Sequence, residues 1–341
     1  MFSPSIYYSG IHHLFSLRYS GLGHILTFHR VVPNTGAYRI HNHKSLEISP
    51  FQLEKTIKYF KENNYLFLKI DQLQDYLLSQ EKRKFVIFTF DDGYIDNYTY
   101  AFPLMVKYKV PFTIYIASGF PDRQIVLWWY YLEDFILNRE RISFEWNNHH
   151  YFYHCRNNYE KEKSFYALRN LFIETWHTEI PDLIKNVSDS KSFNPFEKTE
   201  ELMLDWQQIK KLAGNELITI GGHTVNHLAL SKQTQKMAVY EITHSKERIE
   251  SQTGCFVEHF SFPFGSRNEV SSRDFELISR AGYRTGVTTQ FSNIFVQHTG
   301  KLLSLPRITI NSLVNNKILD LCTSGMIPAI RNKFRRIIAY G

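Results

Sequence analysis

Cysteines, long apolar runs and sequence repeats are scarce or absent in this chain of 341 residues. The three cysteines, Cys155, Cys255 and Cys322, form neither a disulfide framework nor the spacing of a zinc ribbon, which favours a reducing compartment. No apolar stretch approaches the ~20 residues that a helix needs to cross a bilayer. We find no internal repeat. These absences argue against a disulfide-rich secreted domain and against a transmembrane helix.

A secretory leader is also absent from the segment between Met1 and Gly23. No basic segment precedes its apolar residues, His12, His13 and Arg18 interrupt them, and no small-residue cleavage site follows. We therefore expect a cytoplasmic protein.

The chain has no strong excess of one charge, since its net charge is +7 at pH 7. This balance permits an anionic partner but does not indicate nucleic acid, and we expect no nucleic-acid partner. The proportions of apolar residues (43%) and charged residues (21%) are typical of a globular protein. Aromatic residues make up 16%, which suits both a packed core and a cleft that binds sugars.

Apolar runs of strand length alternate with helical patterns along most of the chain, which is typical of parallel βα units. Ser49-Pro50 supplies an N-cap and a first-turn proline for a helix over 51–64. We predict one α/β domain over residues 23–312. Its strands are expected over 23–29, 65–70, 84–90, 112–116, 216–220, 256–262, 283–289 and 303–310.

Residues 136–200 interrupt this alternation. The segment 142–153 alternates around Asn147-Asn148, which predicts a hairpin, and a charged helix with one apolar face follows it. Because the βα pattern then resumes, we interpret 136–200 as an insertion into the domain. Residues 1–22 are expected to form a helical extension ahead of the domain.

The segment 313–341 is predicted to end in a basic amphipathic helix. Four residues share its apolar face: Ile330, Phe334, Ile337 and Ile338. Four positive charges accompany them without any acid: Arg331, Lys333, Arg335 and Arg336. Such a helix over 327–340 can lie on an anionic membrane, which predicts peripheral contact with the inner face of the membrane. Packing of a terminal helix on the domain is the alternative, and the sequence leaves both open.

Two adjacent acids, Asp91 and Asp92, follow the apolar run Phe85-Val86-Ile87 and precede Gly93. Adjacent acids are common in solvated turns. Here, however, a buried strand delivers them to the open end of a sheet, where the chemistry of α/β proteins takes place. Because neighbouring residues on a strand point to opposite sides, we expect the two carboxylates to have different roles.

Two histidines, His223 and His227, stand at i and i+4 directly after a strand and Gly221-Gly222. On one helical turn, both imidazoles can reach a single ion. Pairs at this spacing are often structural. Two histidines and one carboxylate are nevertheless a common metal set that leaves positions open for water and substrate.

Three short motifs occur in a fixed order, at 89–93 (Thr-Phe-Asp-Asp-Gly), 223–227 (His-Thr-Val-Asn-His) and 262–265 (Phe-Pro-Phe-Gly). Two further segments support them, 26–30 (Leu-Thr-Phe-His-Arg) and 305–308 (Leu-Pro-Arg-Ile). Together the set resembles the NodB-type polysaccharide deacetylases of carbohydrate esterase family 4, which include chitooligosaccharide deacetylases. The resemblance covers roughly residues 22–312.

This resemblance implies a distorted (β/α) barrel of about seven parallel strands and hydrolysis of the N-acetyl group of an amino sugar. Matched by position, Asp92, His223 and His227 would hold one divalent metal ion, usually zinc, with cobalt, nickel or manganese as alternatives. Asp91 would be the general base. The backbone N–H of Phe264 would help to hold the oxyanion.

The sequence departs from the family pattern at two places. The arginine of the third motif is not evident at Ser261 or Phe262; Arg307 can orient the base instead, or form a structural salt bridge. The late Leu-x-x-His motif, whose histidine protonates the leaving amine, is also missing. His29 and His298 are the candidates; we favour His29 because it ends a predicted strand, and an inert histidine remains open for either.

Five residues are candidates for substrate binding: Trp128, Trp129, Trp206, Pro263 and Gly265. The first two can stack on a sugar or pack in the core, and Trp206 can line the cleft or only begin a helix. The expected substrate is an N-acetylated oligosaccharide or a lipid-linked glycan precursor. The alternatives are an amidohydrolase that opens cyclic amides on the same fold and a non-catalytic relative that binds glycans or membranes.

Overall fold

Seven parallel strands close into a barrel in the computed structural model, which describes residues 7–81, 83–189 and 193–338. Neighbouring strands follow the order β1, β12, β11, β10, β9, β6, β5, and β5 pairs with β1 to close the circle. Their bounds are β1 (Gly23–Phe28), β5 (Phe85–Phe90), β6 (Phe112–Ile116), β9 (Ile218–Gly222), β10 (His259–Ser261), β11 (Thr285–Phe291) and β12 (Leu305–Thr309). The predicted distorted (β/α) barrel is confirmed. The strand expected over 65–70 is reduced to β4 (Leu66–Phe67), which pairs with the start of β5 outside the circle.

Alternation along the strands separates the barrel interior from the face that the helices cover. In β5, Phe85 and Ile87 belong to one apolar cluster together with inward residues of β1, β6, β11 and β12. The residues between them belong to a second cluster, which the surrounding helices share. Because side chains alternate along a strand, Thr89 and Asp91 continue the first set. The strand thus directs Asp91 into the upper interior of the barrel.

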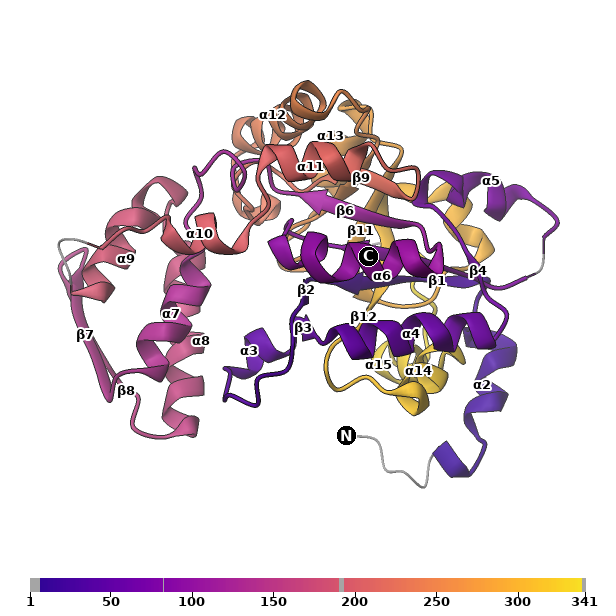
Figure 1. Cartoon of the computed structure of the whole chain (residues 1–341), viewed down its shortest axis with the longest axis horizontal. Helices are drawn as coiled ribbons and strands as arrows, with labels where there is room; N and C mark the ends of the chain where they lie inside the picture. Colours follow the sequence, from indigo (N-terminus) through magenta and orange to yellow (C-terminus); the bar gives the residue numbers. More distant parts are fainter. Residues whose placement is uncertain (1–6, 82, 190–192, 339–341) are drawn as a thin grey trace.

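Helices surround the barrel (Figure 1). Their bounds are α2 (His12–Tyr19), α4 (Pro50–Glu62), α5 (Leu73–Leu78), α6 (Phe102–Tyr108), α11 (Trp206–Ala213), α12 (Gln235–Thr253), α13 (Ser272–Arg280), α14 (Asn316–Thr323) and α15 (Met326–Arg331). Ser49 caps α4 as predicted. Its hydroxyl accepts from the Gln52 amide (3.2 Å), and the Gln52 side chain accepts from the Ser49 amide (3.2 Å).

A lobe inserted between β6 and α11 lies to the left of the barrel in Figure 1. It contains α7 (Trp128–Leu137), β7 (Arg141–Trp146), β8 (His149–His154), α8 (Asn158–Glu174), α9 (Ile180–Ser188) and α10 (Glu197–Leu202). As predicted, β7 and β8 form a hairpin, and its turn residues Asn147 and Asn148 have positive φ angles (50° and 62°). Because α7 packs on α8 and shares the lobe's apolar core, the inserted unit begins ahead of residue 136. Residues 190–192 lie outside the described ranges.

The C-terminal helix predicted over 327–340 is much shorter in the structure. α15 ends at Arg331, and the left-handed backbone of Lys333 (φ 50°) and Phe334 (φ 62°) turns the chain out of the helix. The prediction of one continuous basic amphipathic helix is therefore wrong for the described residues, because local backbone turns override the charge and apolar pattern. Residues 339 and 340 lie outside the described part of the chain.

The short helix α15 packs on the body of the protein. It contacts α2 of the N-terminal extension, and Ile327 joins the apolar cluster between barrel and helices. The guanidinium carbon of Arg331 lies 4.4 Å from the centre of the Phe291 ring. Within the described ranges, no helix combines the length and hydrophobicity needed to cross a membrane. Contact of the tail with a membrane surface stays a prediction.

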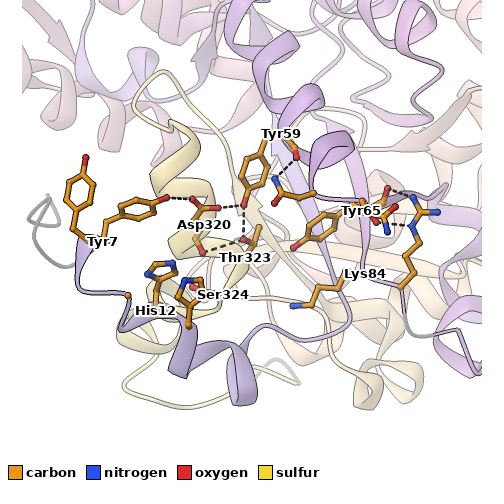
Figure 2. A pocket seen from close by; sticks show the side chains of 14 residues that line it. Tyr7, His12, Tyr59, Tyr65, Lys84, Asp320, Thr323 and Ser324 are labelled. Atoms are coloured by element: carbon orange, nitrogen blue, oxygen red, sulfur yellow. Dashed lines mark hydrogen bonds between the residues drawn. The ribbon is translucent and has the colours of Figure 1, made fainter.

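The end of the barrel where the strands begin carries a cavity of about 700 Å³ (Figure 2). In it, the carboxylate of Asp320 accepts hydrogen bonds from the hydroxyls of Tyr7 (2.8 Å) and Tyr59 (2.7 Å). Lys84, which precedes β5, contributes to the opposite side of the lining. This network ties the N-terminal segment to α14 and α4. None of the site residues predicted from the sequence lines this cavity.

Candidate metal centre and catalytic pocket

A second pocket, of about 340 Å³, opens at the carboxyl ends of the barrel strands. The parallel sheet gathers there the residues that follow β1, β5, β9 and β10, while the inserted lobe supplies part of the wall. The lining includes His29, Asp91, Asp92, His223, His227, Phe264, Trp128, Trp129 and Arg169. The structure thus brings together the predicted ligands, the predicted base and the two tryptophans of α7.

Asp91 is held by a buried guanidinium inside the barrel. Arg307 of β12 is fully buried, and its two terminal nitrogens donate to the two carboxylate oxygens of Asp91 (2.8 and 2.6 Å). Arg307 also donates to the backbone oxygen of Thr288 (3.0 Å) and the hydroxyl of Thr89 (3.2 Å). This two-point geometry fixes the plane of the carboxylate. Arg307 is therefore an ion-pair partner that orients Asp91.

Ser261 gives Asp91 a third hydrogen bond, because its hydroxyl donates to the carboxylate over 3.2 Å. The sequence shows this position only as the place where the family's arginine is absent. Burial would raise the pKa of Asp91, but the charge of Arg307 and its hydrogen bonds hold that pKa below the ordinary value. Asp91 is therefore ionised at neutral pH.

Asp92 points to the two histidines. Its backbone is left-handed (φ 75°), and its Oδ1 lies 3.2 Å from Nε2 of His223 and 3.3 Å from Nε2 of His227. His223 is oriented from behind, since its Nδ1 bonds to the backbone oxygen of Ser261 (2.6 Å). A metal-binding histidine commonly uses its second ring nitrogen in this way. Each imidazole therefore presents Nε2 to the carboxylate.

The histidine pair lies on a loop and not on the helical turn that the spacing predicted. Thr224 and His227 have positive φ angles (65° and 52°), and no helix includes them. The fully buried carboxylate of Glu241, on α12, holds this loop. It accepts from the amides of Val225 (2.9 Å) and Asn226 (2.8 Å) and from the Asn226 side chain (2.6 Å). These backbone bonds replace the helical ones, which a five-residue pattern cannot reveal.

The donor set fits a divalent metal ion. Asp92, His223 and His227 each offer one ligand atom, and these atoms lie within 4.8 Å of one another. Although two imidazole nitrogens approach it, the buried Oδ1 of Asp92 has no partner with hydrogen-bond geometry among the described residues. Burial would raise the pKa of Asp92, but His227 and His223 hold it well below the ordinary value. An anionic oxygen and two nitrogens facing one point are suited to zinc or a related ion.

His29 is the histidine of the pocket outside the ligand set. Within the described part of the chain, its imidazole makes no hydrogen bond, although the ring lines the pocket. Burial lowers its pKa, and the nearby charges of Asp92 and Asp91 partly oppose that shift. The alternative candidate, His298, is not in the pocket, because its Nδ1 is bonded within η5 (Val296–Gly300) to the backbone of Phe295.

Phe264 follows β10 in a strained turn (φ 60°). Its carbonyl oxygen accepts from the hydroxyl of Thr289 (2.8 Å), and the next carbonyl, of Gly265, accepts from the Thr289 amide (3.0 Å). A side chain at Gly265, where φ is 63°, would meet the Thr289 amide at 2.7 Å. Within the described ranges, the amide of Phe264 has no acceptor. It remains available to a substrate oxygen, whereas Pro263 and Gly265 shape the turn and do not line the pocket.

The two tryptophans of α7 form one wall. Trp128 and Trp129 line both this pocket and an adjoining groove of about 370 Å³ against the inserted lobe, and the Trp129 ring lies 5.6 Å from that of His227. Trp206 does not reach either cavity. Its Nε1 donates to Asp122 (2.7 Å), and Arg248 lies over its ring, so its predicted role in the cleft is wrong.

Comparison with known proteins identifies the family of the chain. The family model of polysaccharide deacetylases matches residues 79–286, more than half of the chain, so the chain belongs to the polysaccharide deacetylase family. Among curated proteins it is similar to YxkH of Bacillus subtilis (strain 168), whose name places it among the polysaccharide deacetylases. The two are 23% identical over 256 residues, which cover 74% of this chain and 62% of YxkH. The match therefore spans less than two thirds of that relative.

Several solved structures share the fold. The deacetylase PplD of Streptococcus pyogenes, solved with acetate, gives a TM-score of 0.55 at 19% identity and covers 86% of this chain and 95% of its own. A de-N-acetylase of Aggregatibacter actinomycetemcomitans gives 0.56 at 16% identity, with coverages of 88% and 99%. IcaB of Ammonifex degensii gives 0.54 at 17% identity, with coverages of 89% and 97%. At these identities, the likeness establishes the barrel and not a substrate.

Proposed function

We propose that this protein is a metal-dependent hydrolase that removes the N-acetyl group from an N-acetylated amino sugar of a glycan and releases acetate. The observation that carries the proposal is the division between two adjacent acids. Asp91 is held by Arg307 and Ser261 and stays outside the ligand set, whereas Asp92 faces His223 and His227. One carboxylate is thus free to act as a base beside a site built for a cation.

A divalent ion in this site would polarise the acetamide carbonyl and acidify the attacking water. Asp91 accepts a proton from that water as its oxygen attacks the carbonyl carbon. Because Arg307 and Ser261 engage Asp91 from the barrel interior, they keep the carboxylate ionised and fixed in direction. The same contacts limit the basicity of Asp91.

The backbone amide of Phe264 donates to the oxygen that becomes negative in the tetrahedral state. One such donor is typically worth roughly 2.7–4 kcal/mol of transition-state stabilisation. As the carbon–nitrogen bond breaks, His29 delivers a proton to the leaving amine. Asp91 then releases to solvent the proton that it took from water, His29 regains a proton from solvent, and the products are the free amino sugar and acetate.

Acetate release measured against metal content tests this proposal. Protein stripped with chelator and reloaded with zinc, cobalt, nickel or manganese is incubated with N-acetylated oligosaccharides, free and lipid-linked. We expect activity to follow metal occupancy, with zinc as the native ion. Release of product from a cyclic ureide without any acetate release from sugars would favour the amidohydrolase alternative. Binding of glycan without turnover in the loaded protein would favour a non-catalytic role.

A further inference from the structure

The inserted lobe places one cation in the catalytic pocket. Arg169, on α8, lines the same pocket as Asp91, Asp92 and the two ligand histidines. Its guanidinium carbon lies 5.8 Å from the centre of the Phe264 ring. The Phe264 ring in turn lies 4.9 Å from the ring of His227. A single phenyl ring therefore bridges the guanidinium and a metal ligand.

The guanidinium of Arg169 forms no ion pair with an acidic side chain of the described residues. Within the described ranges, Arg169 makes no hydrogen bond, and no carboxylate oxygen lies within 4.0 Å of its nitrogens. The two buried arginines of the described residues each pair closely with an acid, Arg30 with Asp96 (2.7 Å) and Arg307 with Asp91 (2.6 Å). Arg169 is half-buried and lines a cavity instead.

The surroundings of Arg169 only partly compensate its charge. Burial lowers its pKa, while the charges of Glu269, which lines the same pocket, and Tyr166 raise it. The carboxylate of Glu269 accepts a hydrogen bond from Ser266 in the turn that follows β10. Stacking on Phe264 adds a cation–π contact, which is worth about 0.5–1 kcal/mol at an exposed site. A planar donor with unused N–H groups matches a carboxylate or phosphate at two points.

We propose that Arg169 binds an anionic oxygen group, a carboxylate or a phosphate, which the glycan carries close to the acetamido group. The inference rests on the proposed function and narrows its substrate to a negatively charged glycan. The metal ligands and the Phe264 amide receive the acetyl group, and Arg169 receives the charge across the Phe264 ring. The lobe thereby contacts the anionic group of the glycan, which the barrel alone does not contact.

Three matched substrates test the proposal: a neutral N-acetylated oligosaccharide, the same sugar with a carboxylate, and the same sugar with a phosphate. The full-length, metal-loaded protein is compared with Arg169→Gln, Arg169→Lys and, as a control, Arg156→Gln. Arg156 is an arginine of the same lobe with a mostly exposed side chain, paired with Glu160 (2.8 Å). Thermal unfolding of each variant confirms that it is folded.

We expect the wild-type protein to prefer an anionic substrate. Arg169→Gln should lower the ratio of kcat/KM for the anionic over the neutral substrate by tenfold or more, mainly through KM. Arg169→Lys should retain part of the preference, and Arg156→Gln all of it. The carboxylate and phosphate arms show which group is bound. The proposal would be overturned if Arg169→Gln lowered kcat/KM equally on all three substrates. It would also be overturned if the wild type showed no preference for an anionic substrate.

Calorimetric titration separates this proposal from the function on which it rests. If no sugar yields acetate, the proposed function fails, but the affinity of the three glycans is still measurable. Tighter binding of an anionic glycan that Arg169→Gln abolishes would support the anion site by itself. Equal affinities of wild type and Arg169→Gln for all three glycans would reject it.

Discussion

Replacing Arg307 by methionine removes the partner of a buried carboxylate and keeps an unbranched side chain. Arg307 is fully buried and Asp91 is 2% exposed, so the remaining charge is poorly solvated. Breaking a buried pair by removing one member typically costs 3–5 kcal/mol. We expect Arg307→Met to lower the free energy of unfolding by about that amount at pH 7. Denaturant unfolding with chelator present measures this without a contribution from bound metal.

The pH dependence of this destabilisation follows from the direction in which the pKa of Asp91 is shifted. In the wild type, Arg307 holds the pKa of Asp91 below its ordinary value. That contribution to stability is present above the unfolded-state pKa, about 3.9, and is lost as the pH falls through the lower folded-state value. In Arg307→Met, burial instead raises the pKa of Asp91. The destabilisation should therefore be largest near neutral pH and shrink on acidification.

A double-mutant cycle completes this test. Adding Asp91→Asn to Arg307→Met should restore much of the lost stability, because the uncompensated charge disappears. The exposed pair of Arg156 and Glu160 is the control, and its removal should change the stability far less, because solvent screens an exposed ion pair. A loss below about 1 kcal/mol for Arg307→Met, with no coupling to Asp91, would refute the assignment of Arg307 as the group that holds the base.

Three further predictions concern neighbouring residues. Glu241→Ala should weaken metal affinity by about 10–100-fold, as expected for a residue that supports ligands from behind, and competition with a chromogenic chelator measures it. His29→Gln should lower kcat by about 10²-fold or more while metal content stays unchanged; equal turnover would exclude His29 as the acid. Trp206→Phe removes the hydrogen bond to Asp122 and should lower the unfolding free energy by about 1 kcal/mol without changing KM. A several-fold rise in KM would instead place Trp206 in the cleft.

Periodicity in the sequence predicted parallel βα units, and the resemblance to a known family implied the barrel and the residues at the centre of the site. Each functional motif follows an apolar run, and parallel strands bring such positions to one end, so Asp91, Asp92, His223 and His227 could be placed together in advance. Arg307 was a candidate for orienting the base because the resemblance implies an arginine in the third motif that this sequence lacks. The placement of these four residues at one end of the sheet depends on local periodicity and on the rule that strand ends converge.

Other features depend on contacts between residues far apart in the chain. The loop of the histidine pair owes its shape to Glu241, and Trp206 is held away from the pocket by Asp122 and Arg248. Arg169 could not be identified as a pocket residue from the sequence, because its helix shows an ordinary amphipathic pattern. Only the packing of α8 on α7, whose tryptophans form a wall of the catalytic pocket, brings that side chain to the pocket. Neither propensity nor spacing contains this information.

The central claim, that the two adjacent acids have different roles, is tested most directly by comparing Asp91→Asn with Asp92→Asn. Metal content and acetate release are measured on the same preparations. We predict that Asp91→Asn retains bound metal and loses turnover, whereas Asp92→Asn loses both. Undiminished acetate release by Asp91→Asn, or full metal occupancy in Asp92→Asn, would contradict the account.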